Sequence, residues 1–260
     1  MSEGVHPRAD EFESMSSLEL VELMHAEDAA AVAAMKPQLR TIARAVDEIT
    51  NRLRAGGRLH YFGAGSSGLI AELDASECPA TFGVPADSVQ AHASTDPQDE
   101  DDRELGIAAA KDAAMRPNDV AVGITASGHT AYVLGALAHA KAEGILSVAV
   151  TANPGSPAAR QADVAVEVAT GPEVIAGSTR LKAGTVQKLV LNMLTTAVFT
   201  RLGRTRRGRM TGVVATNAKL RERAARVVAD LAGVSLDEAR RRIEEAGGDI
   251  DAALAEVDRA

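Results

Sequence analysis

The sequence predicts an α/β fold built on a parallel sheet, and three observations lead to this prediction. Short apolar runs alternate with helical segments through the middle of the chain, as they do where parallel strands are joined by helices. The hydrophobic share is 46%, but aromatic residues make up only 2% and Trp is absent, so Ala, Val, Leu and Ile must form the core. With 260 residues, the chain is long enough for one such domain and a small appendage.

The elements are expected in the following order. Residues 17–54 carry apolar side chains at helical spacing, with Ser16 or Ser17 as the cap, and Gly56-Gly57 ends this helical lead-in. Strands are expected at residues 58–62, 88–93, 119–125, 146–151 and 164–168. Helices are expected at residues 67–76, ended by the nearby Pro79, then from the acidic segment 96–104 through Ala114, and at residues 130–143 and 181–202.

The chain after Asn217 is charged and helical, and its apolar residues, Val257 among them, predict a unit of about three helices. Gly247-Gly248 is expected to end one helix and Asp249 to cap the next. The predicted division is a helical lead-in at residues 1–55, a main domain at residues 56–216 and an appendage at residues 217–260. The helix at residues 181–202 is apolar on more than one side. It is therefore either central in the fold or packed in part on a second copy, which favours a homodimer.

Composition and charge exclude several classes of partner. The net charge of −8 opposes binding to nucleic acid or anionic lipid, and two Tyr and four Phe provide no stacking surface for bases. A short basic run is interpreted as the solvated end of the preceding helix (Arg204, Arg206, Arg207 and Arg209). Residues 120–140 lack charged side chains, but a turn at residues 127–130 argues against a membrane span.

The expected compartment is the cytoplasm. With Cys78 alone no intrachain disulfide can form, and a small buried thiol is the expected state of this residue. The acidic start of the chain lacks the basic and apolar regions of a secretory signal. The six His residues include no pair at metal-ligand spacing, so no metal site is expected from them.

A glycine-rich turn, Gly63-Ala64-Gly65-Ser66-Ser67-Gly68, follows the strand expected at residues 58–62. Its backbone N–H groups can converge on an anion at the start of the next helix, and Ser66 and Ser67 add hydroxyl donors. The spelling also fits GxGxxG, but the strand at residues 88–93 does not end on the acidic residue that a dinucleotide needs. No Lys follows the last glycine, as an ATP-binding loop requires. The turn is therefore predicted to bind a phosphate group.

Two further turns repeat this chemistry. Thr125-Ala126-Ser127-Gly128-His129-Thr130 ends another strand, and Gly177-Ser178-Thr179-Arg180-Leu181-Lys182-Ala183-Gly184 opens the long apolar helix and adds two cations. One hydroxyl at a strand end is usually a helix cap, but several hydroxyls around glycines at the ends of parallel strands can face one crevice. The predicted phosphate-binding residues are Gly65, Ser66, Ser67, Ser127, Gly128, Thr130, Ser178, Thr179 and Lys182.

Together the three turns resemble the SIS (sugar isomerase) phosphosugar-binding domain, which implies a doubly wound parallel five-stranded sheet in flavodoxin-like order. Within that superfamily, three runs resemble the N-acetylmuramic acid 6-phosphate etherase family: residues 73–83 (LDASECPATFG), 171–185 (GPEVIAGSTRLKAGT) and 215–217 (ATN). The resemblance extends from about Ser17 to the helical tail. The chain departs from the family at Leu69 and His129, where Arg is usual, at Ala131, where Pro is usual, and in a shortened stretch at residues 89–100.

The resemblance implies a carbon–oxygen lyase that converts N-acetylmuramic acid 6-phosphate and water into N-acetylglucosamine 6-phosphate and D-lactate, without a metal or other cofactor. The family's two catalytic glutamates fall on Glu77, interpreted as the acid that protonates the lactyl oxygen, and on Glu100, as the base for the C2 proton or the incoming water. From the residues alone, Glu100 cannot be preferred over Asp99, Asp101 or Asp102.

Two other functions stay open at this point. An aldose–ketose isomerase, or another phosphosugar lyase, would use a carboxylate base in the same crevice but release no lactate. A non-catalytic sugar-phosphate sensor, which a resemblance to glucokinase regulatory proteins allows, would have no need of an acid at Glu77. In every case the expected partner is a small phosphosugar.

Overall fold

The computed structural model describes residues 4–94, 96, 98–215 and 217–255. It divides into two compact units. The first is built from the residues up to Ala75 and from Asp87–Val198, and the second from Ser76–Ala86 and the residues after Val198. The predicted boundaries at residues 55 and 216 stay a prediction. The sequence prediction also drew on Thr216 and Val257, and both lie outside the described residues.

The first unit contains a parallel five-stranded sheet with the order β2-β1-β3-β4-β5. Its strands are β1 (Leu59–Ala64), β2 (Val89–Ser94), β3 (Val120–Thr125), β4 (Leu146–Thr151) and β5 (Val164–Glu167). Every residue of β1, β3 and β4 is buried, which explains why these strands are continuous apolar runs. The structure confirms the predicted doubly wound sheet, and all five strand predictions agree with it to within one or two residues.

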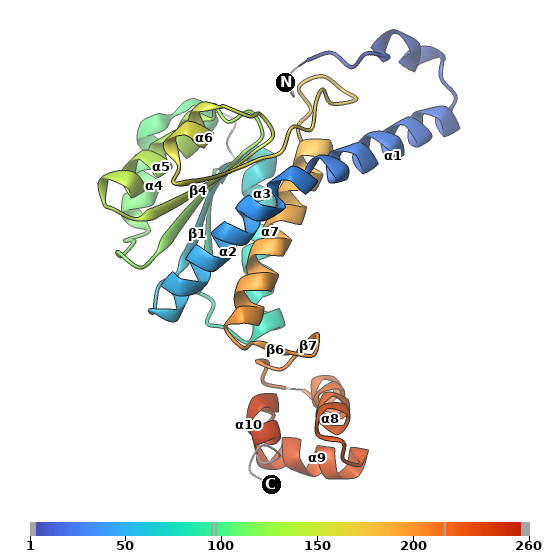
Figure 1. Cartoon of the computed structure of the whole chain (residues 1–260), viewed down its shortest axis with the longest axis vertical. Helices are drawn as coiled ribbons and strands as arrows, with labels where there is room; N and C mark the ends of the chain where they lie inside the picture. The colour runs from blue at the N-terminus through green and yellow to red at the C-terminus, as the bar shows by residue number, and fades with distance from the viewer. Residues whose placement is uncertain (1–3, 95, 97, 216, 256–260) are drawn as a thin grey trace. The chain divides into compact units, whose positions relative to one another are not determined.

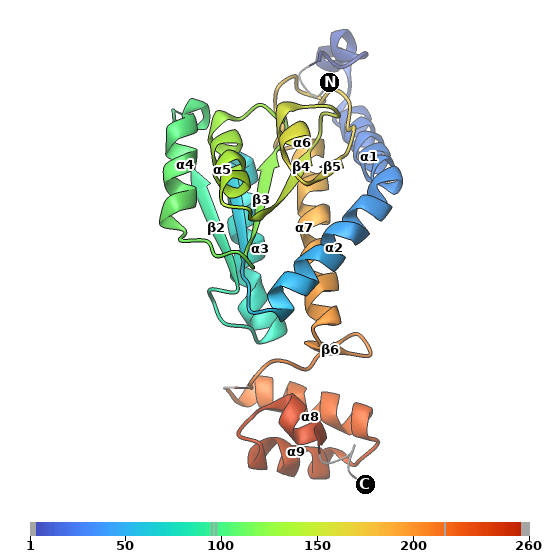
Figure 2. The same ribbon diagram turned by 60° about the vertical axis from the view of Figure 1, so that its left-hand side comes forward.

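Helices cover both faces of this sheet (Figures 1 and 2). One face carries α4 (Arg103–Asp112), α5 (Ala131–Ala142) and the short α6 (Pro157–Gln161), which was not predicted; the other carries α2 (Leu39–Arg54), α3 (Gly65–Phe82) and α7 (Lys182–Arg201). A separate helix, α1 (Ser17–Ala34), precedes α2 and begins with the expected cap, because Ser16 and Glu19 form a reciprocal capping box. Short 3-10 turns lie at Ala9–Ser14, Lys36–Gln38 and Asp99–Asp101.

The helix α7 buries a broad face that includes Val186, Leu191, Leu194 and Val198, while Thr185, Asn192 and Thr196 on the other side are exposed. The helix is therefore not enclosed on all sides, and its packing on a second copy stays a prediction. Among the described residues, no helix is both long enough and apolar enough to span a membrane.

The prediction that Pro79 ends its helix was wrong. Pro79 lies inside α3, which continues to Phe82. A proline removes its own N–H donor, but the turn after it can still form, and the N–H of Gly83 donates to the carbonyl oxygen of Pro79 at 3.0 Å. The helix stops at Gly83, where φ is +62° and an added Cβ would lie 1.5 Å from the carbonyl oxygen of Gly212.

The basic run after α7 was also interpreted incorrectly. It forms a hairpin of two short strands, β6 (Thr205–Arg206) and β7 (Arg209–Met210), and not a helix end. Arg207 and Gly208, which connect the strands, both have positive φ, as a two-residue type I′ turn requires.

The second unit also contains the three predicted helices, α8 (Ala218–Ala232), α9 (Leu236–Glu245) and α10 (Ile250–Ala255). They bury a small common core that includes Ala225, Val228, Ile243 and Leu254. Asp249 caps α10 as expected, because its side chain accepts the N–H of Ala252 at 2.9 Å.

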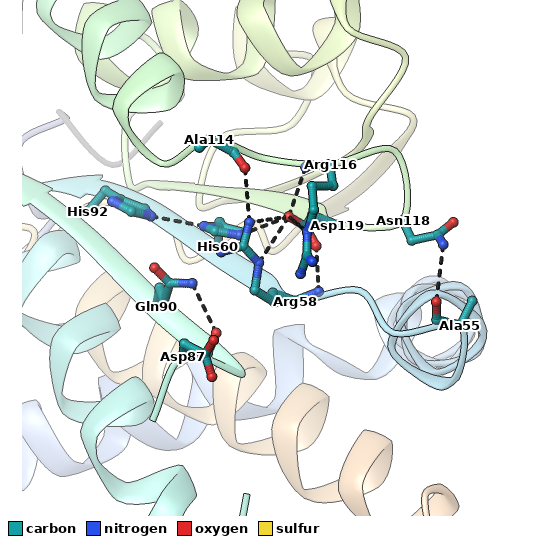
Figure 3. Close-up of polar contacts among 10 residues, drawn as sticks. All are labelled: Ala55, Arg58, His60, Asp87, Gln90, His92, Ala114, Arg116, Asn118 and Asp119. Carbon is teal, nitrogen blue, oxygen red and sulfur yellow. Dashed lines mark hydrogen bonds and ion pairs between the residues drawn. The ribbon is translucent and has the colours of Figure 1, made fainter. Parts of the chain in front are cut away.

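Near the edge of the sheet where the strands begin, the buried His60 and Asp119 lie beside the half-buried His92 and Arg58 (Figure 3). His60 Nδ1 lies 3.0 Å from His92 Nε2, and His60 Nε2 lies 3.4 Å from Asp119 Oδ2. Asp119 accepts hydrogen bonds from the backbone and the guanidinium of Arg58, each at 2.7 Å. Burial, reinforced by His92 and Arg58 and opposed by Asp119, lowers the pKa of His60 from 6.5 to about 4.

This cluster predicts a loss of stability in mild acid. As pH falls from 6.5 towards 4, the unfolded chain takes up the His60 proton before the folded chain does, so stability is complete above this range and decreases through it. The full effect of His60 is about 3 kcal/mol. Urea unfolding followed by circular dichroism should show a shallower pH dependence for His60→Gln, whereas the exposed control His25→Gln should behave as the parent. Equal pH dependence in all three proteins would contradict the assignment.

Candidate active site

The first predicted turn joins β1 directly to α3: the strand ends at Ala64 and the helix begins at Gly65. Gly65 has a φ of +53°, and a Cβ on Gly63 would lie 2.9 Å from the backbone nitrogen of Gly68. Only glycines permit so close a return of the chain. The first N–H groups of α3 therefore point out of the carboxyl edge of the sheet, where the helix dipole favours an anion. Ser66 is exposed there and Ser67 is buried.

The second turn follows β3, which lies beside β1 in the sheet. Its hydroxyls form a directed chain: the N–H of Gly128 donates to Thr125 Oγ1 at 3.0 Å, and Thr125 and Thr130 join their hydroxyls at 2.9 Å. Thr130 in turn donates to Glu100 Oε1 at 3.2 Å. Because a carboxylate only accepts, the direction is fixed from Gly128 through both threonines to Glu100.

Asn153, which follows β4, holds this second turn in place. Its side-chain amide donates to the carbonyl oxygens of Ala126 and Ser127 at 3.2 and 3.3 Å. A cavity of about 370 Å³ lies beside the turn and is lined by Ser127, His129, Ala152, Asn153, Pro154, Gly155, Ser156, Ala169 and Gly171. The sequence did not single out Asn153; its position directly after a buried strand was the available signal.

The structure separates the residues of the acidic run, which the sequence could not do. Asp99 accepts the hydroxyl of Ser94 at 2.8 Å, and Asp102 caps α4 by accepting the N–H of Leu105 at 3.0 Å. Asp101 is exposed. Glu100 is the member of the run that contacts the second turn, through Thr130. The structure thus brings Glu100 to the predicted phosphate-binding residues, whereas Asp99 contacts the side chain of Ser94 and Asp102 caps α4.

The third turn reaches the same edge through small side chains. Ala183 of α7 packs against Ala126 and Ala152, which follow β3 and β4. The fully buried Glu173 accepts the N–H groups of Lys182 and Ala183 at 3.0 and 2.9 Å, and so fixes the start of α7. The ammonium group of Lys182 is paired with Glu27 of α1, and Ser178 and Thr179 are half-buried. The phosphate-binding roles of these three residues stay a prediction.

Glu77 is exposed on α3, in the part of this helix that belongs to the second unit. Its role also stays a prediction. A further residue was missed entirely: Gln187 of α7 accepts the hydroxyl of Ser67 at 3.1 Å. Within the described part of the chain, no group of three or more His, Cys, Asp or Glu side chains is placed to hold a metal ion.

Comparisons with known proteins agree with this fold. Residues 104–197 match the family model of the SIS domain, and residues 36–126 match that of the second SIS domain of glucokinase regulatory protein. The fold resembles a phosphoheptose isomerase from Neisseria gonorrhoeae with a TM-score of 0.55 and 23% identity, covering 71% of this chain and all of the other. A phosphoheptose isomerase from Francisella tularensis matches with a TM-score of 0.54 and 20% identity, and the match covers 72% of this chain and all of the other. The fold is thus that of SIS-type phosphosugar isomerases.

Curated relatives narrow this class to one family. An N-acetylmuramic acid 6-phosphate etherase from Symbiobacterium thermophilum is 48% identical over 98% of this chain and 87% of its own length. The etherase from Pectobacterium atrosepticum is 43% identical over 98% of this chain and 86% of its own length. The etherase from Thermobifida fusca is 44% identical over 97% of this chain and 85% of its own length. The chain belongs to the N-acetylmuramic acid 6-phosphate etherase family.

Gly128 provides a test of the second turn. Its φ is +75°, and an added Cβ would lie 2.2 Å from the Ser156 side chain, whereas Gly144, with a φ of +68°, has open space around it. Alanine at either position costs about 1 kcal/mol of backbone strain. Only Gly128→Ala must also displace a neighbour, so it should lose phosphosugar affinity and further stability in thermal unfolding and calorimetry. Equal behaviour of Gly128→Ala and Gly144→Ala would show that the close contact is unimportant.

Proposed function

We propose that the chain cleaves the D-lactyl ether of N-acetylmuramic acid 6-phosphate, giving N-acetylglucosamine 6-phosphate and D-lactate. The observation that carries the proposal is the hydrogen bond from Thr130 to Glu100, in a chain that belongs to the etherase family. It holds a carboxylate against a hydroxyl-rich turn at the carboxyl edge of a parallel sheet, where open α/β folds bind their ligands. A phosphosugar anchored at this edge would have its sugar within reach of an acid–base group.

The phosphate would be held mainly by neutral donors. The N–H groups at the start of α3 and the hydroxyls of Ser66, Ser67 and Ser127 are the proposed donors, with the α3 dipole adding a favourable field. Thr130 donates its proton to Glu100, so its proposed part in the site is to hold that carboxylate beside the bound phosphosugar. Gly65 and Gly128 would let the backbone approach the phosphate closely. Ser178, Thr179 and Lys182 at the third turn complete the proposed set.

The chemistry needs one base and one acid. Glu100 would take the C2 proton of the open-chain aldehyde, the C2 electron pair would form a C2–C3 double bond, and the C3–oxygen bond would break. Glu77 would protonate the departing lactyl oxygen. Water would then add its hydroxyl to C3 and a proton would return to C2, so that the net reaction consumes one water. These steps need no electron transfer.

The alternatives explain less. An isomerase would not account for the near full-length relationship to the etherases, and a sensor would have no use for Glu77. The proposed setting is cytoplasmic N-acetylmuramate catabolism during peptidoglycan recycling, where the phosphosugar is the partner of the site.

The reaction is tested by incubating the protein with N-acetylmuramic acid 6-phosphate in ¹⁸O-labelled water. We expect D-lactate and label at C3 of the sugar product. Tight phosphosugar binding without lactate would refute the proposed reaction.

The acid is tested by Glu77→Gln, which should lose turnover by about a hundredfold or more while keeping substrate affinity. Glu72→Gln, at another exposed carboxylate of α3, is the matched control and should retain turnover. Unchanged turnover in Glu77→Gln would remove this residue from the mechanism.

A homodimer is also part of the proposal. Leu18, Val21 and Val32 of α1 are 66%, 63% and 48% exposed, and Leu69 and Leu73 of α3 are 56% and 49% exposed. Exposed apolar side chains gathered on two helices are typical of a subunit interface. A second copy of the chain is the proposed occupant.

The dimer is tested by placing a charge on α1. Val21→Glu should shift the protein towards monomer in light scattering, because an unpaired carboxylate would be buried at the interface. Ala30→Glu adds the same charge at an exposed position about half a turn away around this helix and should leave the mass unchanged. A parent protein that is monomeric at micromolar concentration would refute the dimer.

A further inference from the structure

Gln187 lies directly behind the first turn and has an incomplete set of hydrogen bonds. Its side chain, on the second turn of α7, is buried, with 2% of the residue exposed. Its Oε1 accepts the hydroxyl of Ser67 at 3.1 Å. Its Nε2 is fully buried and finds no hydrogen-bond partner among the residues that the structure describes. Ser67 itself is 9% exposed, so this contact is shielded from water.

A buried amide nitrogen without a partner is unfavourable, and an apolar side chain of similar shape would avoid that penalty. Packing alone therefore gives no reason for glutamine at this position. The contact with Ser67 gives one, because Ser67 is a predicted donor to the phosphate group.

The direction of the Ser67 hydroxyl is the critical point. While its proton is donated to Gln187 Oε1, Ser67 can offer only lone pairs to a neighbouring group. A phosphate oxygen requires a donor, so this arrangement is the wrong one for binding an anion. A half-turn of the Gln187 amide exchanges its oxygen and nitrogen, after which Nε2 donates to Ser67 Oγ and the serine proton is available for the phosphate.

We propose that Gln187 is a positioning residue for the phosphosugar: its amide turns when the ligand binds and directs the Ser67 hydroxyl to the phosphate. One rotation gives the buried Nε2 an acceptor and the phosphate a donor. The inference deepens the proposed function, on which it rests for the choice of ligand. It requires only that a phosphate group occupies the first turn, and not that lactate is released.

The first experiment measures binding of N-acetylglucosamine 6-phosphate and of inorganic phosphate by calorimetry. Gln187→Glu keeps the size of the side chain, but an ionised carboxylate can only accept and so retains the Ser67 proton. Affinity should fall by about tenfold or more, because a hydrogen bond to a charged group is lost. The loss should shrink as pH is lowered relative to the parent at the same pH, since a protonated carboxyl can donate to Ser67. A pH-independent loss would indicate altered packing and overturn the proposal.

The second experiment asks whether Gln187 acts through Ser67. Gln187→Leu should weaken binding in the parent but change it by less than about twofold in a Ser67→Ala background, because the group to be directed is already absent. Additive losses would overturn the proposal. Gln161→Leu, which removes a half-buried amide bonded to the carbonyl of Leu134, is the matched control and should leave affinity unchanged.

The outcomes separate this inference from the proposed reaction. Phosphosugar binding with the Gln187 effects but without lactate would overturn the reaction alone. Lactate release with parental affinity in Gln187→Glu and Gln187→Leu would overturn the inference alone. A parent protein that binds neither phosphosugar nor phosphate would overturn both.

Discussion

The site depends on the place in the sheet where the strand order reverses. β1 and β3 are neighbours and both run parallel, yet the chain leaves β1 for α3 on one face and leaves β3 for α5 on the other (Figures 1 and 2). The two following turns must therefore diverge, and their backbone N–H groups cannot all be satisfied by each other. The first and second turns, which carry most of the proposed phosphate donors, lie at the point where these two connections separate. The glycines are needed because the chain must change direction within one or two residues.

A second constraint acts on the polar side chains that surround these turns. Each buried hydroxyl or amide needs a hydrogen-bond partner, so residues far apart in the sequence fix the positions of one another's side chains. The hydroxyl groups of Thr125 and Thr130 have one possible hydrogen-bond direction, because this series of hydrogen bonds ends at the Glu100 carboxylate, which can only accept. Asn153 fixes the same turn from β4. The exposed Glu100 is thereby held beside the second turn, so that a ligand bound there would lie within the hydrogen-bond reach that general base catalysis requires.

The sequence predicted the strands and most helices because their signals are local: apolar runs, caps and glycines within a few residues. It also identified the hydroxyl-rich turns, which are contiguous. It did not show that α3 continues through Pro79, since that depends on where Gly83 meets Gly212. Nor could it distinguish Glu100 from Asp99 and Asp102, because the contact that sets Glu100 apart is with Thr130, which lies 30 residues further along the sequence. Gln187 lies 120 residues from Ser67, and no periodicity links them.

The departures of this chain from its family bear on how the phosphate is held. Leu69, on the first turn of α3, is 56% exposed and carries no charge. The His129 ring contacts the carbonyl oxygen of Ser127 at 3.0 Å, and the Lys182 ammonium is paired with Glu27. The first and second turns therefore present no Lys or Arg side chain of their own, while the third turn keeps the exposed Arg180. Neutral donors must provide most of the binding at the first two turns. Neutral donors are effective only when their protons point at the ligand, because an oxygen lone pair turned towards a phosphate is repulsive. A residue that sets the direction of one hydroxyl then matters more here than it would beside an arginine.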